Sequence, residues 1–332
     1  KKSITLDLRK PQATEILKRL VAECDIMVEN FRPGTLERWG LGYDTLKTVK
    51  PDLILVRISA YGQDGPYRDR PGFARIAHAF SGLAYLAGEA GGRPVMPGST
   101  SLADYISGLY GALGALLAYT ARERFGIGQT IDIALYEGVF RMLDELVPAF
   151  AKSGFVRERM GADTVNIVPH SHYQTGDGKW VALACSTDRM FERLTRVMGR
   201  PDLLAPDRFA TMASREAGRD EVNRIVADWI GSLSRDDVMQ RCLDGEVPLG
   251  PINSVADLFE DPQFKARHNM LTVGDPREGE VVIPNVIPRL SETPGEFRWL
   301  GPDLGQHNEE IYRDRLGYSE AELQLLREAG VI

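Results

Sequence analysis

The sequence predicts an α/β protein in which a Rossmann-like parallel sheet forms a large domain and a smaller α+β domain follows it. Two observations carry this prediction. Strand-like and helix-like segments alternate through the first 150 residues, which is the rhythm of a parallel sheet with helices on its faces. The sequence pattern then changes at residues 155–172, and a hairpin with a glycine-rich turn follows as the start of the second part of the chain.

The large domain is expected to begin with a strand at residues 3–8, where apolar and polar residues alternate. Pro11 then stands in the first turn of a helix whose apolar residues recur at helical spacing. A short apolar strand at 26–28 ends in the turn at 30–34. The elements expected after this turn are a helix at 43–49, a strand at 53–58, a loop at 60–72, a helix at 73–87, a long helix at 102–124, a strand at 129–134 and a helix at 135–152.

The smaller domain is expected over residues 165–290. It opens with the hairpin at 173–184, whose turn is Gly176-Asp177-Gly178. Its further elements are helices near 188–198, 218–232 and 235–243, a loop at 244–253 and a strand at 280–287. Residues 291–332 complete the large domain of residues 1–160. There Ser319 and Glu322 make a capping box, and Gly330 can close the last helix.

The composition excludes several classes of function. The formal net charge of −7 argues against a nucleic-acid partner. The longest apolar stretch, at 106–120, is too short to span a membrane, and from the opening Lys1-Lys2 we expect no signal peptide. The three cysteines form no CxxC pair, so we expect no disulfide framework and a reducing, cytoplasmic setting. Residues 1–75 carry 14 basic against 10 acidic residues, which suits a phosphate-bearing ligand.

Asp104 is the strongest single candidate for chemistry. It follows a cluster of small polar residues and lies in the first turn of the long helix at 102–124. A carboxylate at this place feels the positive end of the helix macrodipole and stays ionised, as a carboxylate nucleophile must be. The structural alternative is that Asp104 only opens the helix, which is a common role of acidic residues.

Seven stretches, in order along nearly the whole chain, resemble the class III CoA-transferases of the CaiB/BaiF type, the family that includes formyl-CoA, carnitine and bile-acid CoA-transferases. They are SITLDLR, DIMVENFRPGTLERWGLGYDTL, PDLILVRISAYGQDGPYRDRPGF, ADYISGLYGALGALLA, GQTIDIALYE, YQTGDGKWVALA and the closing LGQHNEEI…LGYSEAELQLLREAGVI. Each stretch alone is weak, but seven in order are a strong signal. The resemblance implies the family III CoA-transferase fold and an enzyme that transfers CoA.

The resemblance also implies roles for particular residues. The family's nucleophilic aspartate lies at the start of the small-residue helix, which is Asp104 here. The implied CoA contacts are Leu6, Arg9, Asn30, Phe31, Arg32, Arg38 and Arg70. Arginines can fork onto the phosphates of CoA, and a neighbouring apolar ring can cover the adenine.

The reaction that the resemblance implies moves CoA from an acyl-CoA donor to a free carboxylic acid through an aspartyl-CoA thioester. Small dicarboxylic acids fit the family, and Arg75, Arg93 and His78 are candidates to meet a second carboxylate. Gly62 and Gln63 are candidate backbone donors to the oxyanions. CoA serves as substrate and product, and neither a metal nor a redox cofactor is expected.

Family members form intertwined dimers, so the resemblance predicts a homodimer with no nucleic-acid or membrane partner. The family has further strand–helix units before the first matching stretch, and the sequence is therefore expected to be N-terminally incomplete. After Gly72 many relatives carry an acid or an amide-rich pattern, whereas this chain has Phe73 and Ala74. His78, further along, either faces the active site or packs within a helix.

Two alternative functions stay open at this point. An α-methylacyl-CoA racemase shares the fold family, but its pattern places a histidine where this chain has Phe73, and an aromatic hydrocarbon cannot move a proton. A non-catalytic CoA-binding relative is the other alternative, and retention of Asp104 speaks against it. His170 and His172 would share one face of a strand, but no third metal ligand is evident, so we expect no metal site.

Overall fold

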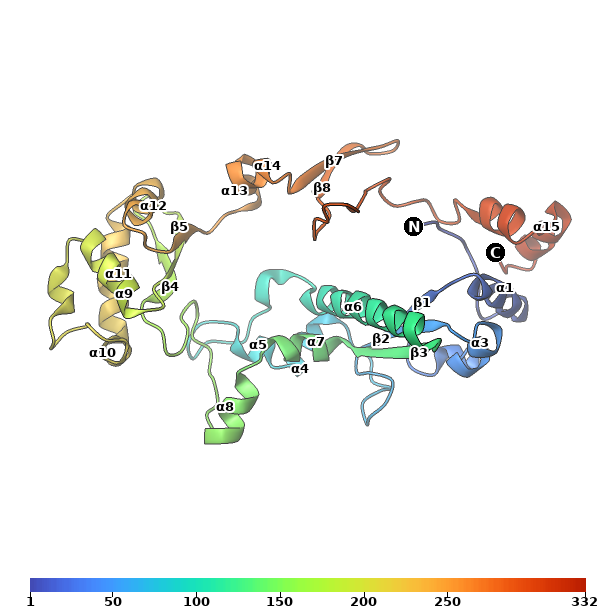
Figure 1. Ribbon diagram of the computed structural model, residues 1–332, viewed down its shortest axis with the longest axis horizontal. Helices are drawn as coiled ribbons and strands as arrows, with labels where there is room; N and C mark the ends of the chain where they lie inside the picture. The colour runs from blue at the N-terminus through green and yellow to red at the C-terminus, as the bar shows by residue number, and fades with distance from the viewer. The chain divides into compact units, whose positions relative to one another are not determined.

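The computed structural model describes residues 1–332, which divide into two compact units. The first unit comprises residues 1–88, 92–159 and 299–332, and the second comprises 89–91 and 160–298. Figure 1 shows the chain coloured from its N-terminus to its C-terminus with its elements labelled. None of the helices combines the length and the apolarity that a membrane span needs.

A three-stranded parallel sheet forms the centre of the first unit. Its strands are β1 (Ile26–Glu29), β2 (Ile54–Ser59) and β3 (Gln129–Ala134), in the order β1-β2-β3. The middle strand is almost entirely buried, as expected of a parallel sheet covered on both faces. The predicted parallel sheet is confirmed, and the segments that follow its three strands emerge at one edge, where such sheets bind ligands.

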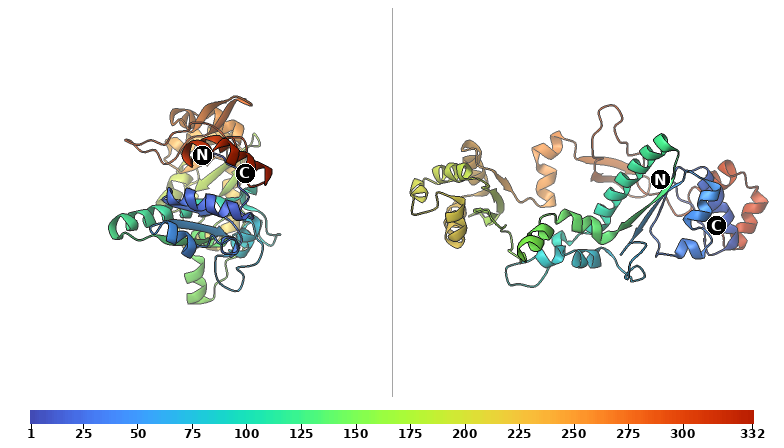
Figure 2. Two further views of the ribbon diagram at one scale, coloured as in Figure 1. Left: turned by 90° about the vertical axis from the view of Figure 1, so that its right-hand side faces the viewer. Right: turned by 60° about the horizontal axis from the view of Figure 1, so that its bottom comes forward.

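The long helix α6 (Leu102–Phe125) lies along this sheet and packs against β2 and β3 (Figure 2). Glycines allow the close approach. An added Cβ at Gly114 would lie 3.0 Å from Ile131 Cγ2, which is tighter than an ordinary contact, whereas one at Gly111 would meet Ile133 Cδ1 at an ordinary 3.5 Å. The start of the helix is thereby held at the edge of the sheet where the strands end.

Two of the helices predicted for the first unit are each divided into two shorter helices. The helix expected at 73–87 is divided into α4 (Ala74–Phe80) and α5 (Leu83–Leu86), because Gly82 takes a left-handed conformation with a φ of 96°. The helix expected at 135–152 is divided as well. The remaining helical segments are α1 (Pro11–Ala22), α2 (Thr35–Arg38), α3 (Tyr43–Val49), η1 (Pro97–Ser99), α7 (Leu135–Met142) and α8 (Leu146–Ser153).

Residues 3–8 form no strand, so that prediction is wrong. Their backbone groups bond instead to residues near the end of the chain. The N–H of Ser3 donates to His307 Nδ1 at 3.0 Å, and the N–H of Asp7 donates to the carbonyl oxygen of Val331 at 2.8 Å. Alternating polarity did not reveal that these partners come from irregular segments rather than from a neighbouring strand.

The two ends of the chain share one hydrophobic cluster in the first unit. It joins α1 to the π-helical segment η3 (Glu309–Arg315) and to α15 (Glu320–Glu328), and α1 and α15 lie side by side in Figure 1. The predicted capping box of the last helix is confirmed, since Ser319 Oγ accepts the N–H of Glu322.

The second unit contains two antiparallel sheets. The predicted hairpin is formed by β4 (His170–Gln174) and β5 (Trp180–Ala184). Part of the segment expected as a loop at 244–253 is a third strand, β6 (Leu249–Pro251), which pairs with β5. The predicted late strand is β8 (Gly279–Pro284), and its partner β7 (Met270–Asp275) was not predicted. The helical segments are α9 (Asp188–Val197), η2 (Pro201–Leu204), α10 (Met212–Ala217), α11 (Arg219–Gly231), α12 (Arg235–Asp244), α13 (Val255–Glu260) and α14 (Pro262–Ala266).

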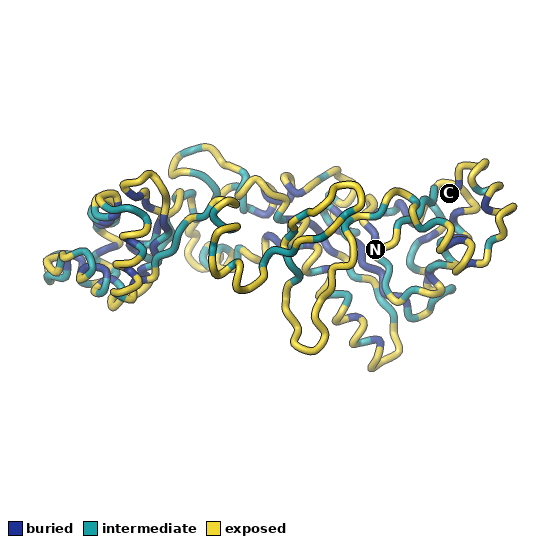
Figure 3. Tube along the Cα trace, turned by 90° about the horizontal axis from the view of Figure 1, so that it is seen from above, coloured by how far each residue is buried: buried dark blue, intermediate teal, exposed yellow.

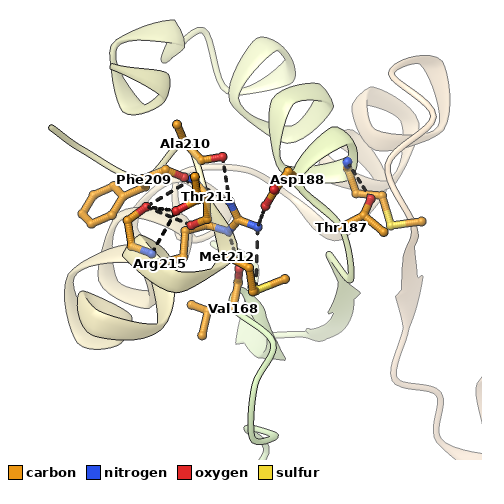
Figure 4. Close-up of polar contacts among 10 residues, drawn as sticks. Val168, Thr187, Asp188, Phe209, Ala210, Thr211, Met212 and Arg215 are labelled. Atoms are coloured by element: carbon orange, nitrogen blue, oxygen red, sulfur yellow. Dashed lines mark hydrogen bonds and ion pairs between the residues drawn. The ribbon is translucent and has the colours of Figure 1, made fainter. Parts of the chain in front are cut away.

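A fully buried arginine ties the second unit together. Arg215 donates to the carbonyl oxygens of Val168 at 2.7 Å and Phe209 at 3.0 Å, and it pairs with Asp188 at 2.7 Å (Figure 4). Its guanidinium also lies over the ring of Phe191. Because these partners compensate the buried charge, Arg215 has a structural role. In Figure 3 the buried residues lie mainly in strands and helices, whereas the connecting loops are mostly exposed.

Candidate active site

A cavity of about 500 Å³ lies at the carboxyl edge of the parallel sheet in the first unit. Its wall includes Asn30, Phe31 and Arg32 from the turn after β1, Arg68, Arg70 and Phe73 from the loop after β2, and Asp104 from the start of α6. Five residues that the sequence singled out, one carboxylate and four candidate CoA contacts, therefore meet in one place. The parallel topology explains the meeting, because it brings successive strand ends to the same edge.

Three other candidate contacts lie outside this cavity. Leu6 packs against the hydrophobic cluster that joins the two chain ends. The side chain of Arg9 is exposed and donates two hydrogen bonds to Asp7, with Nε 2.8 Å from Asp7 Oδ1. Arg38, at the end of α2, donates from Nη2 to Thr35 Oγ1 at 2.8 Å. Arg75 and Arg93, the candidates for a second carboxylate, are exposed and do not line the cavity either.

A buried ion-pair network supports the turn after β1. Arg57 Nε donates to Glu29 Oε1 at 2.7 Å, and Glu29 Oε2 accepts the N–H of Phe31 at 2.6 Å. Arg57 also donates from both terminal nitrogens to the carboxylate of Glu37, at 2.7 and 3.2 Å. These hydrogen bonds lower the pKa of Glu37. The network thus fixes the first residues of the turn to the strands beneath it.

Sequence reasoning did not identify Glu29 and Arg57. Their signal was available, because each is a charged residue at the end of, or within, an otherwise apolar strand. The parallel register pairs them directly across β1 and β2. A buried charge of this kind requires a partner, and the register supplies it.

The loop after β2 is pinned by hydrogen bonds of its own backbone. The N–H of Gly62 donates to Ser59 Oγ at 3.0 Å, and the N–H of Gln63 donates to Asp132 Oδ2 at 2.9 Å. Both groups are therefore occupied by protein acceptors. The suggestion that they hold the oxyanions of the reaction is wrong, since an oxyanion site needs free donors aimed at the reacting carbonyl.

Asp104 is the third residue of α6, and its side chain is exposed in the cavity wall. Its own N–H donates to the carbonyl oxygen of Ser101 at 3.0 Å, while its carboxylate accepts no hydrogen bond from the protein. Beside it, the buried ring of His78 accepts the N–H of Ala103 on Nε2 at 2.9 Å. Burial lowers the pKa of His78, against the opposite pull of the Asp104 carboxylate. The nucleophile candidate thus has a free carboxylate on a fixed backbone.

Arginines and aromatic rings line the rest of the cavity. The guanidinium of Arg70 lies 3.6 Å from the ring centroid of Tyr67, which fixes a flexible side chain on a flat surface. Phe31 packs edge-on against Trp39, with ring centroids 5.2 Å apart. Arg68 adds a cation that sequence reasoning missed, although it stands only two residues before Arg70. The lining can therefore offer both phosphate-binding charge and an apolar ring.

The paired histidines of the second unit acquire no further ligands. His170 and His172 lie in β4, and no group of three or more His, Cys, Asp or Glu side chains in the chain is arranged to hold a metal ion.

A parallel sheet whose ligand edge brings a carboxylate together with several arginines defines an enzyme that acts on an anionic carrier. The model of CoA-transferase family III matches residues 1–308, and the chain belongs to this family. The predicted family, fold and enzyme class are confirmed by this match and by the relatives.

Among the relatives is the alpha subunit of a succinyl-CoA–L-malate CoA-transferase from Chloroflexus aurantiacus, which is 52% identical over 100% of this chain and 78% of its own length. The beta subunit from the same species is 51% identical, over 100% of this chain and 82% of its own length. A crystal structure of a CaiB/BaiF family protein from Brucella suis superposes with a TM-score of 0.82 at 34% identity, covering 94% of this chain and 81% of that one. The chain is accordingly a CoA-transferase.

Proposed function

We propose that this chain transfers CoA from a dicarboxylic acyl-CoA donor to a free dicarboxylic acid, and that Asp104 carries the CoA as an aspartyl thioester. The observation that carries the proposal is the exposed Asp104 carboxylate, unbonded and in one cavity with Arg32, Arg68 and Arg70. The relatives from Chloroflexus aurantiacus are named for succinyl-CoA and L-malate. The first is a thioester of a dicarboxylic acid, and the second is itself a dicarboxylic acid.

CoA would bind to the first unit, which contains the cavity. Arg32 and Arg70 would bind its phosphates, with Asn30 beside them, and Phe31 would cover the adenine. Leu6, Arg9 and Arg38 stay in the proposal as outer contacts for the nucleotide, because they belong to the same unit as the cavity. Arg68 is the added cation of the lining, and it suits the carboxylate of the substrate that does not react.

The reaction begins when a carboxylate oxygen of Asp104 attacks the thioester carbon of the donor. A C–O bond forms and the C–S bond breaks, which gives a mixed anhydride and the CoA thiolate. The thiolate then attacks Cγ of Asp104, which forms the aspartyl thioester and releases the donor's acid as a carboxylate. No proton is gained or lost in either step.

The acceptor completes the exchange by the same steps in reverse. Its carboxylate attacks Cγ of Asp104, which forms a second anhydride and frees the thiolate again. The thiolate attacks the acceptor's carbonyl carbon, so the acceptor leaves as acyl-CoA and Asp104 returns to its carboxylate form. The chemistry needs only CoA, two acids and the side chain, and it uses no metal or redox step.

We also propose that two copies of this chain assemble as an intertwined homodimer in the cytoplasm. One face of α6 exposes large apolar side chains: Tyr105, Leu109, Leu116 and Leu117 are each more than 60% exposed, at 71%, 69%, 65% and 63%. A patch of this kind on a soluble enzyme favours a protein partner. The free thiols of Cys24, Cys185 and Cys242 suit a reducing compartment.

The test is transfer between succinyl-CoA and L-malate, followed by mass spectrometry, for the wild-type chain and for Asp104→Ala. Borohydride or hydroxylamine added during turnover traps an aspartyl thioester on residue 104 if the proposal is right. Wash-in of deuterium at Cα of 2-methylacyl-CoA without acyl transfer would identify a racemase instead. CoA binding with neither reaction would identify a non-catalytic relative.

A further inference from the structure

The first turn of α6 is capped in an unusual way. The residue before the helix, Ser101, makes no capping hydrogen bond with its side chain, although serine is among the best capping residues. The cap comes from another helix. His78 of α4 accepts the N–H of Ala103 on Nε2 at 2.9 Å, and its ring is fully buried.

This hydrogen bond defines the form of the imidazole ring. A nitrogen that accepts an N–H must carry a lone pair, so the ring proton of a neutral His78 lies on Nδ1. Nδ1 is 3.1 Å from Met96 Sδ, and a thioether is a weak acceptor that carries no charge. A protonated ring would present two donors and could not accept from Ala103 at all. The charged groups that act on the ring are Asp104 of α6 and Arg75 of its own helix.

The residue after Ala103 is Asp104. An acidic side chain at the third position of a helix often reaches back to the backbone N–H of the residue before the helix, which is Ser101 here. In this chain the imidazole of His78 already takes the N–H of Ala103, and the N–H of Asp104 is bonded to the carbonyl oxygen of Ser101. The carboxylate of Asp104 makes no bond of this kind and lies in the cavity wall, on a backbone turn that His78 anchors to α4.

We propose that neutral His78 is a positioning residue for Asp104: by accepting the N–H of Ala103 it fixes the first turn of α6 and keeps the carboxylate directed into the cavity. This role rests on the proposed function, in which Asp104 is the nucleophile. The ring of His78 packs in the interior, and it acts on the active carboxylate only through its hydrogen bond to the neighbouring Ala103.

Two substitutions separate the hydrogen bond from packing. His78→Gln keeps an acceptor at a similar reach, and its amide does not titrate; His78→Leu fills similar space without an acceptor. With succinyl-CoA and L-malate as probes, we expect His78→Leu to lower kcat by roughly 10- to 100-fold, as misplacement of a reacting group does. KM for succinyl-CoA should stay within about threefold, because the CoA contacts are untouched. His78→Gln should recover kcat to within about threefold of the wild type.

A second readout is one that a packing role would not change. The rate at which borohydride-trapped thioester accumulates on residue 104 in a single turnover should fall in His78→Leu and recover in His78→Gln. Thermal unfolding of both variants identifies any loss of fold, and the trapping rate is then compared at a temperature where each is folded. If His78→Leu traps thioester at the wild-type rate, or if His78→Gln is as slow as His78→Leu, the proposal is overturned. If the wild-type chain forms no thioester, the proposed function itself fails, and this outcome is distinct from either of those.

Discussion

Arg57 and Glu29 face each other across neighbouring parallel strands, with Arg57 Nε 2.7 Å from Glu29 Oε1, and both side chains are buried. The second oxygen of Glu29 accepts the N–H of Phe31, the second residue of the turn that lines the cavity. An ion pair in the sheet is therefore part of the support of the proposed CoA site. Through these hydrogen bonds, the buried pair helps to hold the surface turn after β1 in place.

Removal of the cation from this pair should destabilise the protein strongly. In Arg57→Met the carboxylate of Glu29 stays buried without its partner, which typically costs about 3–5 kcal/mol. Chemical denaturation measures the loss. The control is Glu37→Gln, which removes the exposed partner of the same arginine and should cost no more than about 1 kcal/mol. Equal losses in the two variants would contradict the assignment of the buried pair as the main support.

Asp104→Ala should abolish transfer, with a fall in kcat of at least about 1000-fold, because no other carboxylate lines the cavity to replace the nucleophile. Asp104→Asn tests the charge alone at the same size. Binding of succinyl-CoA, measured by calorimetry, should survive in both variants. A variant that still transfers CoA at the wild-type rate would remove Asp104 from the mechanism.

Arg32→Gln and Arg70→Gln should each raise KM for succinyl-CoA by roughly 10-fold with little change in kcat, since one phosphate contact is lost in the ground state and in the transition state alike. The effect should shrink at high salt, where phosphate contacts are screened. Arg200→Gln is the matched control, because Arg200 is an arginine of the second unit that is paired with Asp202. A KM that rises as much in the control would show a general charge effect.

The stability of the fold should depend on His78 at mildly acidic pH. Burial lowers the pKa of His78 below its ordinary value of 6.5, so the folded state favours the neutral ring more than the unfolded state does. The stability gained in this way is fully present above pH 6.5 and is lost as the pH falls through the folded pKa. Between about pH 7.5 and about pH 5, Tm should therefore fall more in the wild type than in His78→Gln. An equal fall in both would mean that other groups account for it.

An extra methyl group at Gly138, where α7 packs against α6, should lower the stability of the protein. An added Cβ at Gly138 would lie 2.7 Å from Ile106 Cγ2 and 3.1 Å from Tyr110 Cδ2, so Gly138→Ala should cost about 1–3 kcal/mol. Gly111→Ala is the control in α6, because its Cβ would meet Ile133 only at 3.5 Å. That substitution should be neutral or stabilise the helix by up to about 1 kcal/mol. Thermal unfolding compares the two, and a stabilised Gly138→Ala would contradict the packing described.

Local patterns predicted the sheet well. An apolar run identified β2, which is buried along almost its whole length, as a central strand of a covered parallel sheet must be. The same reasoning failed at residues 3–8, whose partners near His307 and Val331 are three hundred positions away in the chain. It also missed β6, three residues long, because its strand character comes from pairing with β5 and not from its own composition.

The candidate site was predictable where one segment carried the chemistry. Asp104 and the turn at residues 30–34 have local signatures, and the structure brings them to one cavity. The cap by His78 was not predictable, since it depends on how α4 meets α6. Sequence patterns also could not show that the N–H of Gln63 is already hydrogen-bonded, because its acceptor, Asp132, lies on another strand.

The cluster that joins α1 to η3 and α15 has a consequence for how the protein is made. A ribosome releases residues 160–298 as one uninterrupted stretch, so the second unit can close its core while synthesis continues. The first unit must wait for its last helix, and during that delay the apolar side of α1 has no native neighbours. The nascent chain should therefore depend on chaperones most in the interval before residues 299–332 emerge.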